Sequence, residues 1–175
     1  MTELAILELG SNIEPEANLP RAVSALSEIG NIRAISKAYR TEPFGPPGQP
    51  PFVNAALSME TDLEPLALRQ RLRQIEADIG RQRGYYKYAP RAIDIDLCLY
   101  GQRTLNQERL ELPDPDIFER PYLARTIAEI APDFMHPVAK TSMADIANEL
   151  DPEHSLEPDP ALSESLLDAW QEAET

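Results

Sequence analysis

The sequence predicts an α+β fold of the ferredoxin-like type, a split βαβ sandwich in which two helices pack on one face of an antiparallel sheet and leave the second face open. Three observations support this prediction. The expected elements follow the order β-α-β-β-α-β, the stretch APRAIDIDLCLYG alternates apolar and polar residues, and two helical stripes each end at a glycine. A chain of 175 residues is long enough for one domain with a sizeable core.

The elements follow from periodicity and from the residues that end them. Leu19, Val23 and Leu26 recur on one helical face after a proline, as do the apolar residues between Pro65 and Gly80. In the fourth strand, Ile93, Ile95, Leu97 and Leu99 are expected on a single apolar face. In chain order we expect strand 5–9, helix 15–29, strand 32–41, strand 52–61, helix 65–79 and strand 93–99.

The remaining segments complete the predicted organisation. EPFGPPGQPP, residues 42–51, holds five prolines and two glycines and is expected to be an exposed loop. Residues 104–150 add a hairpin and two small helices, near 121–130 and 143–150. We therefore predict one domain over residues 1–150. Residues 151–175 form an acidic C-terminal extension with one short helix, which either packs on the domain or stays loose.

Charge and cysteine content exclude several classes of protein. The net charge of −14 argues against general nucleic-acid binding, and ten acidic residues but no lysine or arginine follow Lys140. Cys98 is the only cysteine, so a disulfide framework is excluded and a reducing compartment is expected. No apolar stretch is long enough for a membrane span. We expect a cytoplasmic protein, a monomer without membrane or nucleic-acid partners.

The fourth strand carries two acidic residues on the face opposite its apolar side chains. Asp94 and Asp96 lie two positions apart on one strand face, roughly 7 Å from each other. Such a pair is tolerable when a divalent cation neutralises it, and Mg²⁺ prefers one or two carboxylates together with substrate phosphates. The pair therefore predicts a magnesium site that serves phosphoryl transfer.

Basic and aromatic residues gather around the same strand. Residues 69–91 hold seven of the sixteen positive charges, and Arg81, Arg83 and Arg91 flank the approach to the aspartates. Arginines placed there can hold phosphate oxygens bidentately. On the third strand, Phe52 and Asn54 share a face, and a ring beside an amide suits a planar heterocycle.

Six motifs make a family resemblance specific. They are LGSN (9–12), YRTEPFG (39–45), QPPFVNAA (49–56), IEADIGRQR (75–83), PRAIDIDLCLYG (90–101) and LPDPDIFERPYLARTIAEIAPD (112–133). In order and spacing they resemble the 6-hydroxymethyl-7,8-dihydropterin pyrophosphokinases of folate biosynthesis over about residues 4–150. The most specific part is PRAIDIDL with the upstream GRQR.

The resemblance implies transfer of the pyrophosphoryl group of ATP to the hydroxymethyl oxygen of the pterin, with release of AMP. It implies that Asp94 and Asp96 hold two Mg²⁺ ions and that Arg81 and Arg91 grip the phosphates. The implied ATP-side residues are Glu76, Arg83, Arg109, Asp114 and Arg120. The implied pterin-side residues are Thr41, Phe44, Phe52, Asn54, Tyr88 and Tyr122.

Two departures from the family pattern leave an alternative open. Asp114 stands where the family usually has histidine, and a carboxylate near a triphosphate should weaken ATP binding unless it faces away or meets Arg109 or Arg120. Tyr88 stands where tryptophan is frequent. The alternative is a paralogue that binds pterin or nucleotide but turns over weakly or not at all. A nucleotide-sugar transferase is a third hypothesis, and it leaves PRAIDIDL unexplained.

Overall fold

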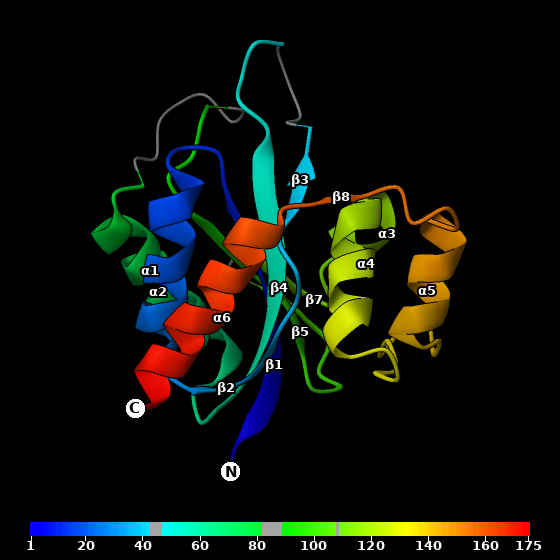
Figure 1. Ribbon diagram of the computed structural model, residues 1–175. Helices are drawn as coiled ribbons and strands as arrows, with labels where there is room; N and C mark the ends of the chain where they lie inside the picture. The colour runs from blue at the N-terminus through cyan, green and yellow to red at the C-terminus, as the bar shows by residue number, and fades with distance from the viewer. Residues whose placement is uncertain (43–46, 82–88, 108) are drawn as a thin grey trace.

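A six-stranded antiparallel sheet forms the centre of the protein (Figure 1). The computed structural model describes residues 1–42, 47–81, 89–107 and 109–175. The strand order is β5-β1-β4-β3-β8, and β2 also pairs with β4. The strands are β1 (Glu3–Ser11), β2 (Asn31–Ile35), β3 (Tyr39–Thr41), β4 (Phe52–Thr61), β5 (Asp94–Tyr100) and β8 (Glu157–Pro158). With β1 between β5 and β4, the sheet has the split βαβ arrangement, which confirms the predicted ferredoxin-like fold.

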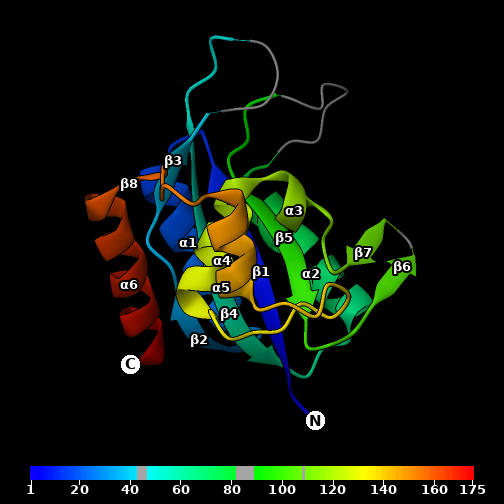
Figure 2. The ribbon, with the colours of Figure 1, turned by 90° about the vertical axis from the view of Figure 1, so that its right-hand side faces the viewer.

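Helices pack on both faces of the sheet. On one side lie α1 (Pro15–Ser27), α2 (Pro65–Ile79) and α6 (Pro160–Glu174). On the other lie α3 (Asp116–Glu119), α4 (Pro121–Ile130) and α5 (Met143–Leu150), with the hairpin of β6 (Leu105–Gln107) and β7 (Leu110–Leu112) beside β5 (Figure 2). The prediction that the second face is open is therefore wrong in part, because α4 and α5 bury an apolar cluster at one end of it.

The segment predicted as one strand over 32–41 is two strands. Both β2 and β3 pair with β4, but the chain between them has one residue more than the facing stretch of β4, since Ile35 pairs with Leu57 and Tyr39 with Asn54. Ser36 fills the break: its N–H donates to the carbonyl of Ala56 (2.9 Å) and its hydroxyl accepts from the N–H of Ala56 (2.9 Å). A local hydroxyl thus replaces a ladder hydrogen bond.

The expected single apolar face of β5 is also wrong at one position. Ile6 pairs with Leu99 and Leu7 with Leu97, so Cys98 is an extra residue that forms a β-bulge. Beyond the bulge Leu99 joins the cluster under α4 and α5, and Tyr100 takes the place on the α1 and α2 side. Asp94 and Asp96 precede the bulge and remain on the face opposite Ile95 and Leu97.

The C-terminal helix packs on α1. Leu162 and Leu166 are buried in the main core and Trp170 lies against it, which accounts for the apolar spacing in the sequence. The helix begins after Asp159, whose carboxylate accepts from the N–H of Leu162 (3.0 Å). Of the two alternatives for this segment, the structure has the packed one. Within the described residues no helix is both long and apolar enough to cross a bilayer.

Neighbouring leucines test the packing of α6. Leu166 is fully buried, whereas Leu167 is 42% exposed. We expect Leu166→Ala to lower the free energy of unfolding by about 2–5 kcal/mol, because it removes buried methyl groups and leaves a cavity. Leu167→Ala, the matched control, should cost less than about 1 kcal/mol. Equal costs in urea unfolding would show that α6 is not packed on α1.

Candidate functional site

The register of three strands brings the predicted site residues to one face of the sheet. Gly10 on β1 pairs with Asp94 on one side and with Asn54 on the other. Two residues along, Glu8 pairs with Asp96 and with Ala56. Because paired residues of neighbouring strands point to the same side, the aspartates and Asn54 lie on one surface with Gly10 between them.

A partly buried ionic network fixes Asp94. Its two carboxylate oxygens accept from Arg81 (2.7 Å) and from Arg91 (2.9 Å). Burial alone would raise the pKa of Asp94, but the two guanidinium groups outweigh it and hold that pKa below its usual value. Asp94 is therefore a carboxylate at neutral pH, flanked by two groups able to bind phosphate.

Glu76 anchors this network from α2. Its side chain is 1% exposed and accepts hydrogen bonds from Arg73 (2.8 Å), Arg81 (2.7 Å) and the N–H of Ile95 (2.8 Å). The last bond satisfies a backbone donor on the outer edge of β5. Glu76 thus ties α2 to the strand that carries both aspartates.

Asp96 differs from Asp94 in its surroundings. Within the described part of the chain its carboxylate has no hydrogen bond or salt bridge. Burial, followed by the charges of Asp94 and Asp114, raises the pKa of Asp96 well above its usual value. A carboxylate held near other negative charges favours a bound cation.

The donor set fits magnesium. Among the described residues there is no cluster of three or more His, Cys, Asp or Glu side chains that could hold a metal ion. Mg²⁺ does not need one, since it binds proteins through one or two carboxylates and takes its other ligands from water and phosphate. Asp94 and Asp96 can supply those two carboxylates.

Glu8 is a buried acid that the sequence analysis did not identify. Thr126 Oγ1 lies 3.1 and 2.9 Å from its two oxygens and 2.9 Å from the carbonyl of Tyr122. Burial is the main cause that raises the pKa of Glu8 well above its usual value. A protonated Glu8 can donate to Thr126, which then donates to Tyr122, so every group finds a partner. The signal in the sequence was an acid within an apolar strand.

The residues predicted to bind a heterocycle are centred on Asn54. Asn54 is buried, and its Nδ2 donates to Thr41 Oγ1 over 2.6 Å, while Thr41 pairs with Phe52 across β3 and β4. Gly10 makes room for this amide, since a Cβ there would lie 2.7 Å from Asn54 Oδ1. The glycine of LGSN is thus explained by close approach of a side chain.

Asn12 joins the two segments that border the site. Its Nδ2 donates to Gln49 Oε1 and to the carbonyl of Pro50, each at a distance of 3.3 Å. Its Oδ1 accepts from the N–H of Arg91 (2.7 Å). This role of Asn12 was not predicted from the sequence, because it depends on residues far along the chain.

A cleft of about 240 Å³ opens beside Asp96, between α2 and the β6–β7 hairpin. Its lining includes Arg69, Arg73, Arg109 and Asp114. Burial raises the pKa of Asp114 to about 6. Asp114, which was predicted to lie on the nucleotide side, shares this cleft with three arginines. Arg69 and Arg73 were not among the predicted site residues, and Arg73 Nε is buried without a hydrogen-bond partner in the described structure.

Tyr122 and Arg120 lie at the start of α4. Arg120 Nη1 donates to the Tyr122 hydroxyl over 3.3 Å, and Arg120 also forms a salt bridge with Asp116 (3.5 Å). Burial is the main cause that raises the pKa of Tyr122 to about 12. Three other predicted site residues, Phe44, Arg83 and Tyr88, lie outside the described residues.

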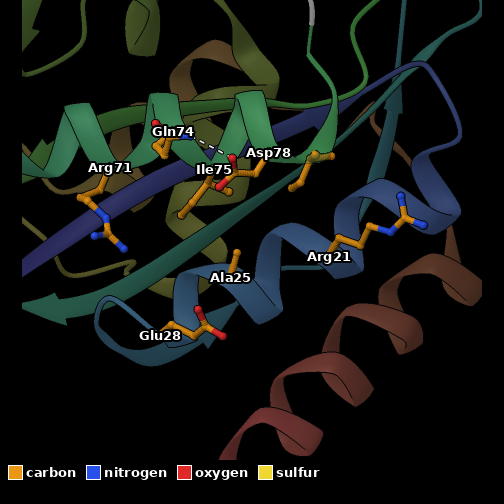
Figure 3. Close-up of a pocket in the computed structure, with 8 residues that line it drawn as sticks. Arg21, Ala25, Glu28, Arg71, Gln74, Ile75 and Asp78 are labelled. Carbon is orange, nitrogen blue, oxygen red and sulfur yellow. Dashed lines mark hydrogen bonds between the residues drawn. The ribbon is translucent and has the colours of Figure 1, made fainter.

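A second hollow, of about 300 Å³, lies between α1 and α2 (Figure 3). Arg21, Ala25 and Glu28 line one side. Residues of α2 line the other, where Gln74 donates to Asp78 over 2.9 Å. These helices cover the face of the sheet opposite the aspartates, and the lining includes no aromatic ring. This hollow is therefore separate from the site residues.

Comparison with known proteins agrees with this description. Residues 6–132 match the family model of 7,8-dihydro-6-hydroxymethylpterin-pyrophosphokinase. A Synechocystis protein named 2-amino-4-hydroxy-6-hydroxymethyldihydropteridine pyrophosphokinase is 37% identical over 150 residues, which cover 84% of this chain and 76% of that protein. A protein of the same name from Methylorubrum extorquens is 40% identical over 134 residues, covering 75% of this chain and 84% of that one.

Solved structures show the same fold. The Plasmodium falciparum HPPK-DHPS structure with pteroate superposes with a TM-score of 0.71 at 14% identity. The match covers 88% of this chain and 44% of that one, so the chain spans less than half of its length. At this identity the likeness concerns the fold alone.

Fold, site and relatives together define a transferase enzyme on a ferredoxin-like scaffold. The chain belongs to the 7,8-dihydro-6-hydroxymethylpterin-pyrophosphokinase family, as the six sequence motifs predicted.

The buried acid gives a stability prediction. The folded state holds the Glu8 proton more tightly than the unfolded chain does, so stability falls as pH rises above the usual carboxyl pKa of about 4.3. We expect Glu8→Gln, whose amide can still donate to Thr126, to raise the melting temperature of metal-free protein at about pH 8 by on the order of 3 °C. The gain should shrink toward about pH 4.

Thermal unfolding across that pH range is the measurement. Glu3→Gln, at the exposed start of the same strand, controls for removal of a charge. A gain that is the same at every pH would contradict the raised pKa.

Proposed function

We propose that this protein transfers the pyrophosphoryl group of ATP to 6-hydroxymethyl-7,8-dihydropterin in folate biosynthesis. The observation that carries the proposal is the strand register, which sets Asp94 and Asp96 beside Asn54 on one face. Phosphate-directed and heterocycle-directed groups are thus neighbours. The family membership supports both substrates.

In the proposed reaction the hydroxymethyl oxygen attacks the β-phosphorus of ATP. The bond from that phosphorus to the oxygen bridging it to the α-phosphorus breaks, so AMP leaves with the bridging oxygen and the hydroxyl proton is released. Asp94 and Asp96 would hold Mg²⁺, with two ions expected, which when bound neutralises charge on the phosphate oxygens. The chain itself supplies positioning and electrostatic stabilisation.

The arginines have distinct proposed roles. Arg81 and Arg91 already lie within hydrogen-bond distance of Asp94, so they can contact phosphate oxygens next to a metal held there. Glu76 has its oxygens occupied by Arg73, Arg81 and a backbone N–H, and it acts by holding those arginines. Arg83 is proposed to close over ATP.

The cleft beside Asp96 is proposed to take the nucleotide. Arg109 lines it with Asp114, and Arg120 lies nearby at the start of α4. Arg69 and Arg73 add positive charge to the same cleft, although Arg73 is paired with Glu76 and Glu111 adds a further acid. The family membership, rather than the charge of the cleft, favours an active enzyme over the inactive paralogue.

The pterin is proposed to bind over Asn54. Thr41 orients the amide, and Phe52 supplies a ring from the same strand. Phe44, Tyr88 and Tyr122 are proposed to complete the aromatic surround. We further propose that the protein is a cytoplasmic monomer without nucleic-acid or membrane partners, with residues 1–150 as the catalytic unit and 151–175 as an extension.

Product analysis tests the proposed reaction. We expect AMP, not ADP, to be released from ATP, and only when Mg²⁺ and the pterin are both present. Asp96→Asn should lower the rate by at least about 100-fold, because half of the carboxylate pair is lost. Since the Asp96 carboxylate has no hydrogen bond or salt bridge among the described residues, the melting temperature of the Asp96→Asn variant should not fall below that of the wild type.

Asp78→Asn, on the far side of α2, is the control and should keep the wild-type rate. Pterin binding without AMP release in the folded wild-type protein would favour the paralogue. Release of ADP would point to a different transfer.

Gly10→Ala tests the heterocycle side. The added Cβ would displace the Asn54 amide from Thr41, so we expect the KM for pterin to rise on the order of 10-fold while the KM for ATP changes less. Thr41→Ser keeps the hydroxyl that Asn54 contacts and should leave both values within about twofold. Steady-state kinetics with each substrate varied in turn is the measurement. An unchanged pterin KM would argue against Asn54 as a substrate contact.

A further inference from the structure

We propose that residues 157–163 position the pterin side of the site by holding the short strand β3, with Ser163 as the positioning residue. The inference rests on the proposed function, since it assigns these residues a role in binding that substrate. They lie beyond residues 6–132, the part of the chain that matches the family model.

The hold on β3 begins with backbone pairing. β8 adds a two-residue strand to β3, with Tyr39 opposite Pro158 and Arg40 opposite Glu157 (Figure 1). β3 itself has only three residues, and strands this short depend on their neighbours for stability. β8 also covers the ladder edge of β3 that would otherwise face solvent.

Ala38, the residue before β3, is hydrogen-bonded through both its N–H and its carbonyl to residues of the segment 157–163. Ala38 is fully buried, its carbonyl accepts from the N–H of Asp159 (2.8 Å), and its N–H donates to Ser163 Oγ (2.8 Å). A buried peptide N–H without an acceptor is costly, so the Ser163 hydroxyl is an important partner. Asp159 adds a salt bridge to Arg40 (3.3 Å).

The holding segment is itself anchored. Ser163 Oγ donates to the carbonyl of Asp159 (2.7 Å), which links the cap of α6 to its first turn. Leu162 and Leu166 are buried in the core beside α1. β3 is therefore connected to the main core through α6.

A single hydrogen bond connects β3 to the residues proposed to bind the pterin. Thr41, the last residue of β3, accepts from the Asn54 amide and pairs with Phe52. On the opposite side Glu129 of α4 accepts from the Tyr39 hydroxyl (2.9 Å) and from the N–H of Lys37 (3.2 Å). β3 is thus held between α4 and the C-terminal segment, and release of one holder should loosen Thr41.

Two serines on α6 provide a matched test in the full-length protein. Ser163→Ala removes the acceptor of the Ala38 N–H, whereas Ser165→Ala removes an exposed hydroxyl bonded only within its own helix, to Ala161 (3.1 Å). We expect Ser163→Ala to raise the KM for pterin about 3- to 10-fold, the effect of one lost hydrogen bond, with the KM for ATP within about twofold. Amides 37–41 should exchange hydrogen faster. Ser165→Ala should match the wild type, and Ser163→Thr, which keeps the hydroxyl, should restore pterin KM.

The outcomes separate the two proposals. Equal pterin KM values in the two alanine variants, or equal rises in the KM for both substrates, would overturn the positioning role. Faster exchange without a change in pterin KM would also overturn it, because the contact would then be structural only. A wild-type protein that binds pterin but releases no AMP would refute the proposed function, and pterin Kd then replaces KM in the same comparison. A wild type that binds no pterin would refute both.

Discussion

The buried carboxylate of Glu76 is the group on which the charged half of the site depends. Burying a carboxylate costs several kcal/mol unless charges and donors compensate it, and here two arginines and one backbone N–H do so. The same bonds fix Arg81 against Asp94 and join α2 to β5. The helix that carries Glu76 and Arg73 and the strand that carries the aspartates are thereby held in one relative position.

Charge is balanced across the site by different elements. The sheet contributes negative charge from Asp94 and Asp96, while α2 and the segments beside β5 contribute arginines. Asp114 adds a further acid, and burial raises its pKa to about 6. The lining of the cleft therefore holds arginines and carboxylates together.

Local patterns in the sequence predicted the framework well. The strand Phe52–Thr61 and the helix Pro65–Ile79 have the predicted bounds, because each has a clear period and Gly80 ends the helix. The acidic pair and its arginines were found for a similar reason, since they lie within a short stretch. Family resemblance, rather than periodicity, supplied the substrates.

The sequence could not show features that depend on distant contacts. Glu8 and Thr126 are 118 residues apart, and Asn12 contacts segments 37 and 79 residues away. The break at Ser36 and the packing of α4 and α5 on the second face likewise depend on tertiary contacts, which override local propensity. These contacts determine which residues line the site. The two helices themselves were predicted from the sequence, near 121–130 and 143–150.

The extra residue at Cys98 has a consequence for how a single strand can serve two environments. A strand that alternates without interruption would have one polar face and one apolar face along its whole length. The bulge shifts the alternation of side chains along β5 by one residue. The same face of the sheet is therefore ionic around Asp94 and Asp96 and apolar around Leu99. Insertion or deletion of one residue at the bulge would move the side chains on one side of it to the opposite face of the sheet. The number of residues in β5 therefore matters as much as the identity of its two aspartates.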